Sequence, residues 1–180
     1  TIKRFVHNKT IIVDLGKVEA ILPSRYYPII EKYSVGERVQ ALLYEVRDTD
    51  NGGAEVILSR SHPEFVKELF IQEVPELKEE VVEIVQIVRE AGYRTKLVVK
   101  SNDSKVDPVG TCVGVRGTRI KNVIREVNNE KIDVIPYSEN PFELLQNSIA
   151  PVEIQRVKEE EDGREESSET CTAYLQRTTG

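Results

Sequence analysis

Two glycines followed in sequence by an expected basic helix are the part of this 180-residue chain best suited to binding a ligand. Gly114 and Gly117 bracket two residues, so the backbone can turn tightly there and approach a ligand without Cβ atoms in the way. From Thr118 onward apolar residues recur at helical spacing, and the first N–H groups and positive dipole end of such a helix would face the same turn. This combination suits the phosphates of a single nucleic-acid strand.

Glycines at this spacing also occur in ordinary turns between helices, so the flanking residues decide between the two interpretations. The apolar stripe of the expected helix consists of Ile120, Val123, Ile124 and Val127. The cations that lie off this stripe are Arg116, Arg119, Lys121 and Arg125. Over residues 94–125, eight Lys and Arg accompany only two acidic residues, a net charge of +6 in a chain whose total is −6. A basic stripe on an acidic body favours local binding of RNA over unspecific adhesion.

We therefore predict an RNA site at the glycine turn. Its residues are Val113, Gly114, Val115, Arg116, Gly117, Thr118, Arg119, Ile120 and Lys121, with Arg94 as a further candidate. Phosphates would lie at the turn and at the start of the helix. Bases would lie over an apolar floor formed by Val113, Ile120 and the strand 132–135.

Composition limits the class of protein. A hydrophobic content of 39% and a charged content of 31% are typical of a soluble globular chain, here long enough for one large or two small domains. No apolar run reaches membrane-spanning length and no signal peptide opens the sequence, so we predict a cytoplasmic protein without a membrane partner. Cys112 and Cys171 are the only cysteines and lie far apart, which argues against a disulfide framework.

Catalysis is not indicated by any cluster of residues. His7 and His62 are the only histidines, and neither belongs to a group with metal-ligand spacing, so no metal site is predicted. Cys112 lies on an apolar helix face, which is typical of a buried structural thiol. The glycine turn lacks the Lys-Ser/Thr pair of a phosphate-binding P-loop. We predict no enzyme activity and no cofactor.

Residues 1–61 predict a small all-β barrel. The expected strands are 10–15, 18–22, 38–48 and 54–59, with a hairpin turn at 48–53. The third of these should have its apolar positions at Val39, Leu43 and Val46. Oligonucleotide-binding (OB) barrels hold single strands by aromatic stacking beside a basic groove. The weaker candidates for that role here are Lys3, Arg4, Phe5, His7, Arg25 and Tyr26, although Phe5 and Tyr26 could equally pack in the core.

The residues from His62 onward predict alternating helices and strands, giving an α+β chain overall. The expected elements are a helix over 64–72, strands over 81–91 and 95–101, a short helix capped by Asp107, a helix over 118–127, a strand over 131–137 and a helix over 141–150. The order helix, strand, strand, helix, helix, strand is that of a type II KH domain. In KH domains a G-x-x-G loop between paired helices clamps about four nucleotides.

Several motifs in the correct order resemble the NusA family of bacterial transcription elongation and termination factors, over about residues 1–157. The matching stretches are 13–16, 58–65, 90–96, 107–114 with Gly117 and Arg119, and 131–138. The resemblance implies an OB barrel of the ribosomal S-one type over 1–61, with an incomplete first strand, and a type II KH domain over 62–150. It also implies a monomer that binds nascent single-stranded RNA and RNA polymerase and modulates pausing, termination and antitermination.

Two departures from the family pattern are expected. The polymerase-binding N-terminal domain of the family is absent from these residues. Residues 151–180 carry four Lys and Arg against eight acidic residues and lack apolar periodicity, so we predict an acidic, disordered tail in place of a second KH domain.

Two other functions stay open. A barrel followed by a KH domain also occurs in RNA-processing, exosome-like assemblies, which bind a nuclease rather than a polymerase. A KH fold that has lost RNA binding could serve as a protein-interaction module, although the charge of +6 over 94–125 argues against it.

Overall fold

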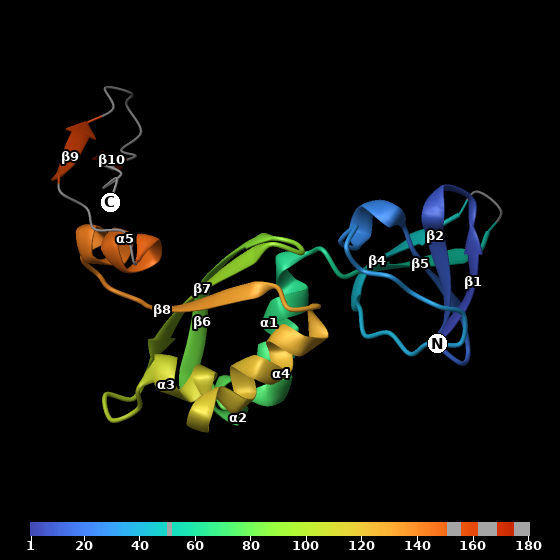
Figure 1. The fold of residues 1–180 in the computed structure, drawn as a ribbon, viewed down its shortest axis with the longest axis horizontal. Coiled ribbons are helices and arrows are strands. Elements are labelled where there is room, and N and C mark those ends of the chain that lie inside the picture. The colour runs from blue at the N-terminus through green and yellow to red at the C-terminus, as the bar shows by residue number, and fades with distance from the viewer. Residues whose placement is uncertain (50–51, 151–155, 162–168, 175–180) are drawn as a thin grey trace, which may run out of the picture. The chain divides into compact units, whose positions relative to one another are not determined.

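The structure is a computed structural model that describes residues 1–49, 52–150, 156–161 and 169–174. The chain divides into two compact units, Thr1–Val134 and Ile135–Gly180, which are described separately (Figure 1). The first unit contains both the predicted barrel and most of the predicted KH domain.

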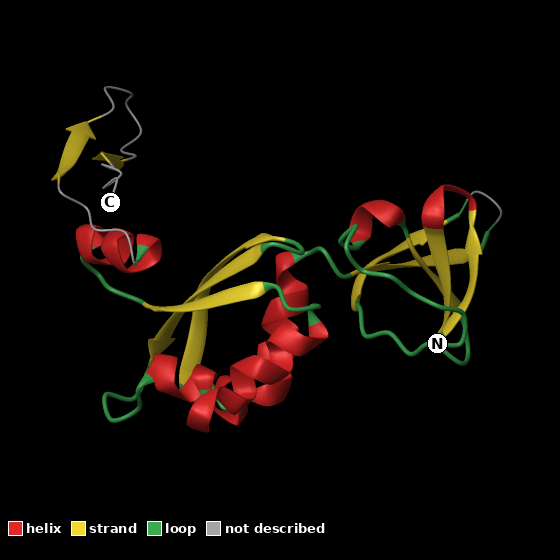
Figure 2. Cartoon of the chain, in the orientation of Figure 1, coloured by secondary structure: helices red, strands yellow, loops and turns green. Residues whose placement is uncertain are grey.

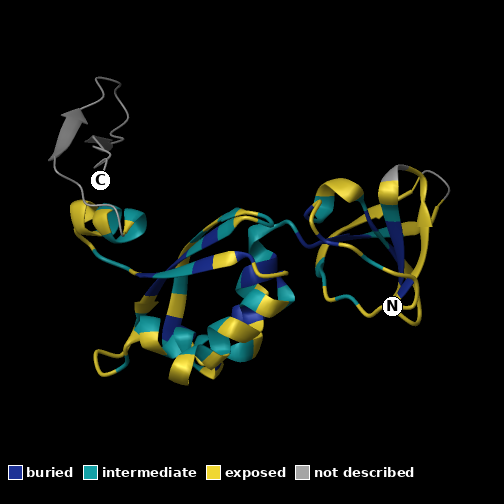
Figure 3. Ribbon diagram, in the orientation of Figure 1, coloured by how far each residue is buried: buried dark blue, intermediate teal, exposed yellow. Residues whose placement is uncertain are grey.

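The N-terminal part of the first unit is a five-stranded sheet with the order β1-β2-β3-β5-β4. Its strands are β1 (Ile2–Val6), β2 (Thr10–Asp14), β3 (Glu19–Leu22), β4 (Leu42–Asp48) and β5 (Ala54–Ser59). β3 and β5 pair in parallel, and the other neighbours are antiparallel. Short 3-10 helices, η1 (His7–Lys9) and η2 (Ser24–Tyr26), follow β1 and β3. One cluster of buried residues in this sheet consists of Ile2, Ile11, Val13, Ala20, Leu22 and Leu58, so the predicted barrel has its own apolar core (Figure 3).

The third predicted strand differs from the observed one. It was expected over 38–48, whereas β4 begins only at Leu42. Of the three apolar positions expected in it, Val39 lies before the strand, and Leu43 and Val46 are 58% and 56% exposed. β4 is an edge strand that pairs only with β5, and every one of its residues after Leu42 is exposed. Apolar residues in a predicted strand therefore do not by themselves show which positions are buried.

The first strand, predicted to be incomplete, pairs with β2 from Ile2 to Val6. On its other side the backbone N–H of Ile2 donates to the carbonyl of Glu37 at 2.8 Å, and the N–H of Gly36 donates to the carbonyl of Ile2 at 2.8 Å. The segment 36–37 therefore continues the hydrogen bonding beyond β1.

The second half of the first unit has the predicted element order. Its elements are α1 (Pro63–Glu73), α2 (Pro75–Lys78), β6 (Val82–Glu90), β7 (Arg94–Ser101), α3 (Pro108–Val113), η3 (Val115–Gly117), α4 (Thr118–Glu126) and β8 (Lys131–Pro136). The strands form one sheet in the order β6-β7-β8, with the helices packed against one of its faces (Figure 2). Two short elements were not predicted: α2, a single turn that begins at Pro75, and η3, which lies within the glycine turn.

The direction of β8 identifies the type of KH fold. The N–H of Lys131 donates to the carbonyl of Tyr93 at 3.2 Å, so β7 and β8 begin at the same edge of the sheet and run in parallel. The core beneath the sheet is built from α1, α4 and the strands. Its buried residues are Phe65, Val66, Leu69, Phe70, Val74, Val82, Leu97, Val99, Cys112, Val123, Val127 and Ile132. A barrel followed by a KH domain is thus confirmed.

Helix starts follow their capping signals. Oδ1 of Asp107 accepts a hydrogen bond from the N–H of Val109 at 3.1 Å, as predicted, with Pro108 in the first turn. Nδ1 of His62 accepts from the N–H of Glu64 at 3.2 Å and caps α1 in the same way. Both helices are therefore positioned by residues immediately before them.

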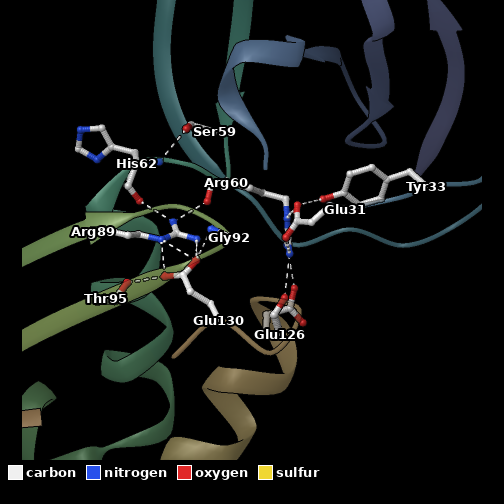
Figure 4. Close-up of polar contacts among 10 residues, drawn as sticks. All are labelled: Glu31, Tyr33, Ser59, Arg60, His62, Arg89, Gly92, Thr95, Glu126 and Glu130. Atoms are coloured by element: carbon white, nitrogen blue, oxygen red, sulfur yellow. Dashed lines mark hydrogen bonds and ion pairs between the residues drawn. The ribbon is translucent and has the colours of Figure 1, made fainter. Parts of the chain in front are cut away.

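The barrel and the KH domain share a buried arginine, Arg60 (Figure 4). Its guanidinium donates to both carboxylate oxygens of Glu31 at 2.8 Å and to the carbonyl of Gln40 at 2.6 Å. It also binds Glu126 of α4, through the carboxylate at 2.9 Å and the carbonyl at 2.8 Å. Burial alone would lower the pKa of Arg60, but the hydrogen bonds and charge of Glu31 outweigh it and raise that pKa.

A second buried pair lies beside the first. The guanidinium of Arg89 donates to Glu130 at 2.9 Å and to the carbonyls of Arg60 at 2.5 Å and His62 at 3.1 Å. Glu130 also accepts from the N–H of Gly92 at 2.8 Å and the hydroxyl of Thr95 at 2.5 Å. Burial opposes ionisation of Glu130, yet these donors together lower its pKa.

These two arginines hold the residues around position 61 in place from both sides. That explains why the first compact unit runs without a break through the predicted boundary between residues 61 and 62. The predicted boundaries at 61 and 150 stay predictions.

The second unit contains α5 (Pro141–Ile149), capped by the side chain of Asn140, which accepts from the N–H of Phe142 at 3.0 Å. It also contains β9 (Arg156–Glu161) and β10 (Glu169–Tyr174), which pair in antiparallel register. Parts of the predicted disordered tail therefore form two paired strands, and β10 contains Thr170, Thr172 and Tyr174, residue types that favour strands. Residues 151–155, 162–168 and 175–180, on which the rest of that prediction falls, lie outside the described residues.

Candidate nucleic-acid interface

The glycine turn projects from the KH domain between α3 and α4. Gly114 and Gly117 have φ angles of 75° and 74°, and Arg116 between them has a φ of 55°. Val115, at the tip, is 81% exposed. A left-handed arginine costs on the order of 1 kcal/mol, which a purely structural turn would avoid with a third glycine. The turn is thus exposed to solvent rather than packed in the interior.

Glycine is required at position 114 for space as well as for φ. A Cβ atom at Gly114 would lie 2.8 Å from Cγ of Arg119. At Gly117 the nearest atom would be Cε of Lys121 at 3.5 Å, so the positive φ alone favours glycine there. The two glycines therefore let the first turn of α4 approach the loop.

Several backbone amides at the turn have partners within the protein, including that of Thr118, which donates to the carbonyl of Val115. The N–H of Gly114 donates to Gly110 at 2.8 Å and that of Gly117 to Gly114 at 3.0 Å. The start of α4 has no side-chain cap and no acidic residue in its first turn. Its positive dipole end therefore stays uncompensated by the protein, which is the condition for binding an anion.

Two cations border the turn without a carboxylate partner among the described residues. Arg116 is exposed, and Nζ of exposed Lys121 donates to the carbonyl of Arg116 at 3.0 Å. Neither forms an ion pair within the described part of the chain. Two of the four predicted cations of this helix and turn, Arg116 and Lys121, thus have no counter-ion among the described residues.

Arg119 was predicted to belong to the RNA site, but in the structure its side chain contacts other parts of the protein. Its Nη1 donates to Glu76 of α2 at 3.0 Å and to the carbonyl of Thr111 at 2.8 Å, and its Nη2 donates to Glu76 at 3.3 Å. The side chain thereby braces the end of α3 against α4. In the structure, the positive charge of Arg119 is balanced by a carboxylate 43 residues away.

The remaining predicted residues of this site are spread over the sheet and helix. Val113 and Ile120 are half-buried, whereas Ile132 is part of the core, so it supports the expected apolar floor from beneath rather than forming its surface. Ile135 falls in the second compact unit. Arg94 donates to Asp133 across the sheet at 2.5 Å, and that carboxylate raises the pKa of Arg94.

The barrel candidates separate into two groups. Lys3 and Arg4 on β1 both bind Glu19, at 2.5 and 3.3 Å, and these two cations lower the pKa of Glu19. Phe5 is 45% exposed, which excludes it from the core, and His7 is exposed on η1. Arg25 and Tyr26 lie on η2 instead.

The ring of Tyr26 contacts that of Tyr44, and Tyr44 contacts His62. Sequence reasoning missed Tyr44 and His62 as possible binding residues. Nothing in their spacing along the chain links them to Tyr26.

Other chemistry receives no support. Cys112 is buried, and burial raises the pKa of its thiol to about 11, so it is not poised as a nucleophile. Among the described residues there is no group of three or more His, Cys, Asp or Glu arranged to hold a metal ion. The helices in that part of the chain are all too short or too polar to cross a membrane.

Comparisons with known proteins agree with this geometry. A family model described as the NusA-like first KH domain matches residues 60–137, which include the glycine turn. The protein named transcription termination/antitermination protein NusA from Borreliella burgdorferi is 42% identical over 150 residues, covering 83% of this chain. The chain belongs to the NusA family.

Other NusA proteins match over nearly the same length. The Halalkalibacterium halodurans protein is 40% identical over 155 residues, or 86% of this chain, and the Thermus thermophilus protein is 37% identical over 157 residues, or 87%. The chain spans 31% of the length of the Borreliella NusA and 40% of the other two.

The predicted family is thereby confirmed. The prediction of no enzyme activity is also supported, because these relatives are named as transcription termination/antitermination proteins and not as enzymes. The NusA-like KH match begins at Arg60, the residue that the barrel and the KH domain share.

Proposed function

We propose that this chain binds single-stranded RNA through the glycine turn and the start of α4, as part of a factor that regulates transcription. The observation that carries the proposal is the exposed, cationic, uncapped turn at 114–118 within a NusA-like KH domain. RNA phosphates would bind at the start of α4, which lacks a side-chain cap, and Arg116 and Lys121 would neutralise them.

The other predicted site residues would have different roles in binding. Gly114 and Gly117 shape the turn, Val115 and Thr118 border it, and Arg119 positions it. Half-buried Val113 and Ile120 would contact a base, and Arg94 with Asp133 would present polar groups to base edges at the sheet.

The biological setting follows from the relatives. Because they are named as transcription termination/antitermination proteins, we propose that the RNA is a nascent transcript and that the larger partner is RNA polymerase. The effect would be on pausing, termination and antitermination, exerted in the cytoplasm by a monomer. Residues 1–61 would act as the barrel domain and 62–150 as the KH domain. An RNA-processing role has no observation of its own in its favour.

The test replaces both residues at the tip, Val115→Asp with Arg116→Asp, and measures binding of the tetranucleotide ACAC by fluorescence anisotropy. We expect at least about a tenfold loss of affinity, because two carboxylates would face the phosphates and one cation would be removed.

A matched control is Val35→Asp with Arg38→Asp, which makes the same chemical change at an exposed loop of the barrel. It should bind as the parent does. Equal affinities for the parent and the tip variant, with unchanged circular dichroism, would place the RNA site elsewhere.

A further inference from the structure

The strand β6 has an edge that no other strand covers in the described part of the chain. The sheet order is β6-β7-β8, so β6 pairs only with β7 there. An edge strand leaves one row of backbone N–H and C=O groups unpaired, and such a row can pair with a strand from another molecule. Val85 and Val88 on this strand are 43% and 61% exposed. The edge therefore offers backbone hydrogen bonds together with apolar contacts.

A groove lies beside the first residues of this edge. It has a volume of about 400 Å³, and its lining comes from α1, α2, the start of β6 and the residues just before β6 and just after β7. Its apolar side chains are Ile71, Leu77, Val82 and Ile84. Because alternate residues of a strand point to the same face, a strand added to β6 would direct an apolar side chain into this groove.

The pairing of β6 with β7 divides the edge into two segments. The register shifts between Ile84 and Gln86, and regular pairing resumes from Gln86 to Glu90. A bulge of this kind interrupts the ladder locally. An added strand would therefore pair regularly with 86–90, while its continuation would reach the groove beside 82–84.

The rim of the groove is acidic. Residues 76–83 contain four glutamates and one lysine. Glu76 is paired with Arg119 at 3.0 Å. Glu79 and Glu80 are exposed, and neither forms an ion pair with any residue that the structure describes. These two carboxylates therefore give the rim a negative charge that favours a basic ligand.

Other charged groups around the groove change this balance little. Lys67, the one cation in the groove lining, has its Nζ 3.4 Å from a carboxylate oxygen of Glu64. Glu83 also lines the groove, but it lies opposite Lys100 in the register of β6 and β7, so it contributes less to the net charge. The acidic character of the rim thus depends mainly on positions 79 and 80.

The backbone that carries Glu80 is held in place. Glu80 has a φ of 58°, a left-handed conformation that glycine or asparagine adopts more readily. Nδ2 of Asn102 donates to its carbonyl at 2.9 Å, and the N–H of Asn102 donates to the carbonyl of Val81 at 2.9 Å. The rim is therefore positioned before a ligand arrives, which reduces the entropy lost on binding.

We propose that the open edge of β6 and the adjacent groove bind an extended basic peptide of a protein partner. The peptide adds as a strand to β6, places an apolar side chain in the groove and brings Lys or Arg to Glu79 and Glu80. A second copy of this chain would present the same glutamates at the same edge, so repulsion between like charges disfavours it as the occupant. The site is separate from the glycine turn and does not depend on RNA binding there.

Binding of the fluorescein-labelled peptide Lys-Val-Lys-Val-Lys-Val-Lys, measured by anisotropy, tests the inference. Glu80→Lys should weaken binding about fivefold, because it reverses a charge at the rim. The matched control is Glu45→Lys, the same change at an exposed glutamate of the edge strand β4, and it should bind as the parent does. The peptide Lys-Gly-Lys-Gly-Lys-Gly-Lys keeps the charge without the apolar side chains and should bind the parent more weakly.

A second measurement uses the parent protein alone and is independent of how any variant folds. In amide NMR spectra, Lys-Val-Lys-Val-Lys-Val-Lys should shift the signals of 86–90 and slow hydrogen exchange at that edge. The signals of β4 should not change.

Several results would overturn the inference. One is equal affinity of the parent, Glu80→Lys and Glu45→Lys, with unchanged thermal unfolding. Another is a set of shifted signals that excludes β6. If β6 signals move with protein concentration in the absence of peptide, the edge pairs with a second copy instead. If ACAC displaces the peptide, the peptide occupies the RNA site. Failure of RNA binding at the glycine turn would leave the peptide measurements unaffected.

Discussion

Arginines at the glycine turn and arginines at the barrel–KH junction have opposite surroundings. Arg116 is exposed, stands in a left-handed conformation and has no carboxylate partner among the described residues. Arg60 and Arg89 are buried and have several hydrogen-bond acceptors each. Their charges are neutralised by acceptors within the protein, and these contacts stabilise the junction. A cation therefore indicates a binding site only where the fold leaves it unpaired.

Arg119 lies between these two extremes. It sits at the start of the helix that borders the turn, yet Glu76 balances its charge. The basic stripe counted along the sequence thus contains residues of both kinds. Two kinds of variant test this contrast. One removes the carboxylate partner of a buried arginine, and the other removes the carboxylate partner of Arg119 beside the turn.

The largest effect is expected at the junction. Glu130→Gln would leave the buried charge of Arg89 without a counterion, and breaking such a pair typically costs about 3–5 kcal/mol. The free energy of unfolding, measured by urea titration, should fall by roughly that amount. The control is Glu90→Gln, which replaces an exposed glutamate next to Arg89 in the sequence. It should change the free energy of unfolding by less than about 0.5 kcal/mol. Equal stability of the two variants would show that the junction pair is not a stabilising element.

A smaller decrease in the free energy of unfolding should accompany acidification. The folded-state pKa of Glu130 lies below the ordinary value of 4.5, so its contribution is present above pH 4.5 and is lost as the pH falls through the lowered folded pKa. Unfolding free energies measured below pH 4.5 should decline more steeply for the parent than for Glu130→Gln. Parallel curves for the two proteins would argue against a lowered pKa.

The smallest effect concerns the paired arginine beside the turn. Glu76→Gln keeps a hydrogen-bond acceptor for Arg119 but removes the balancing charge, so the affinity for ACAC should rise about two- to threefold at low salt. The gain should vanish at high salt, where the charge is screened. Weaker binding would instead mean that the ion pair is needed to hold the turn in shape.

Local signals explain how much of the chain could be predicted from its sequence. The G-x-x-G turn, the cap at Asp107 and the helix after Thr118 each depend on residues within one or two turns of each other. The order of helices and strands in the KH domain follows from such signals, and so does the exposed turn at the candidate site. The same reasoning failed for β4, which begins at Leu42, because the exposure of Leu43 and Val46 depends on which elements pack against that strand, and local spacing does not show this.

The tertiary structure alone decided which residues far apart in the chain come into contact. Sequence alone determined which residues are charged, which are aromatic and where the backbone can turn. Only the fold placed Glu76 beside Arg119, Glu126 beside Arg60, and Tyr44 between Tyr26 and His62. The physical reason is that a charge or a ring takes its role from its partners and its exposure. Those are set by packing across the whole first unit and leave no periodic trace in the sequence.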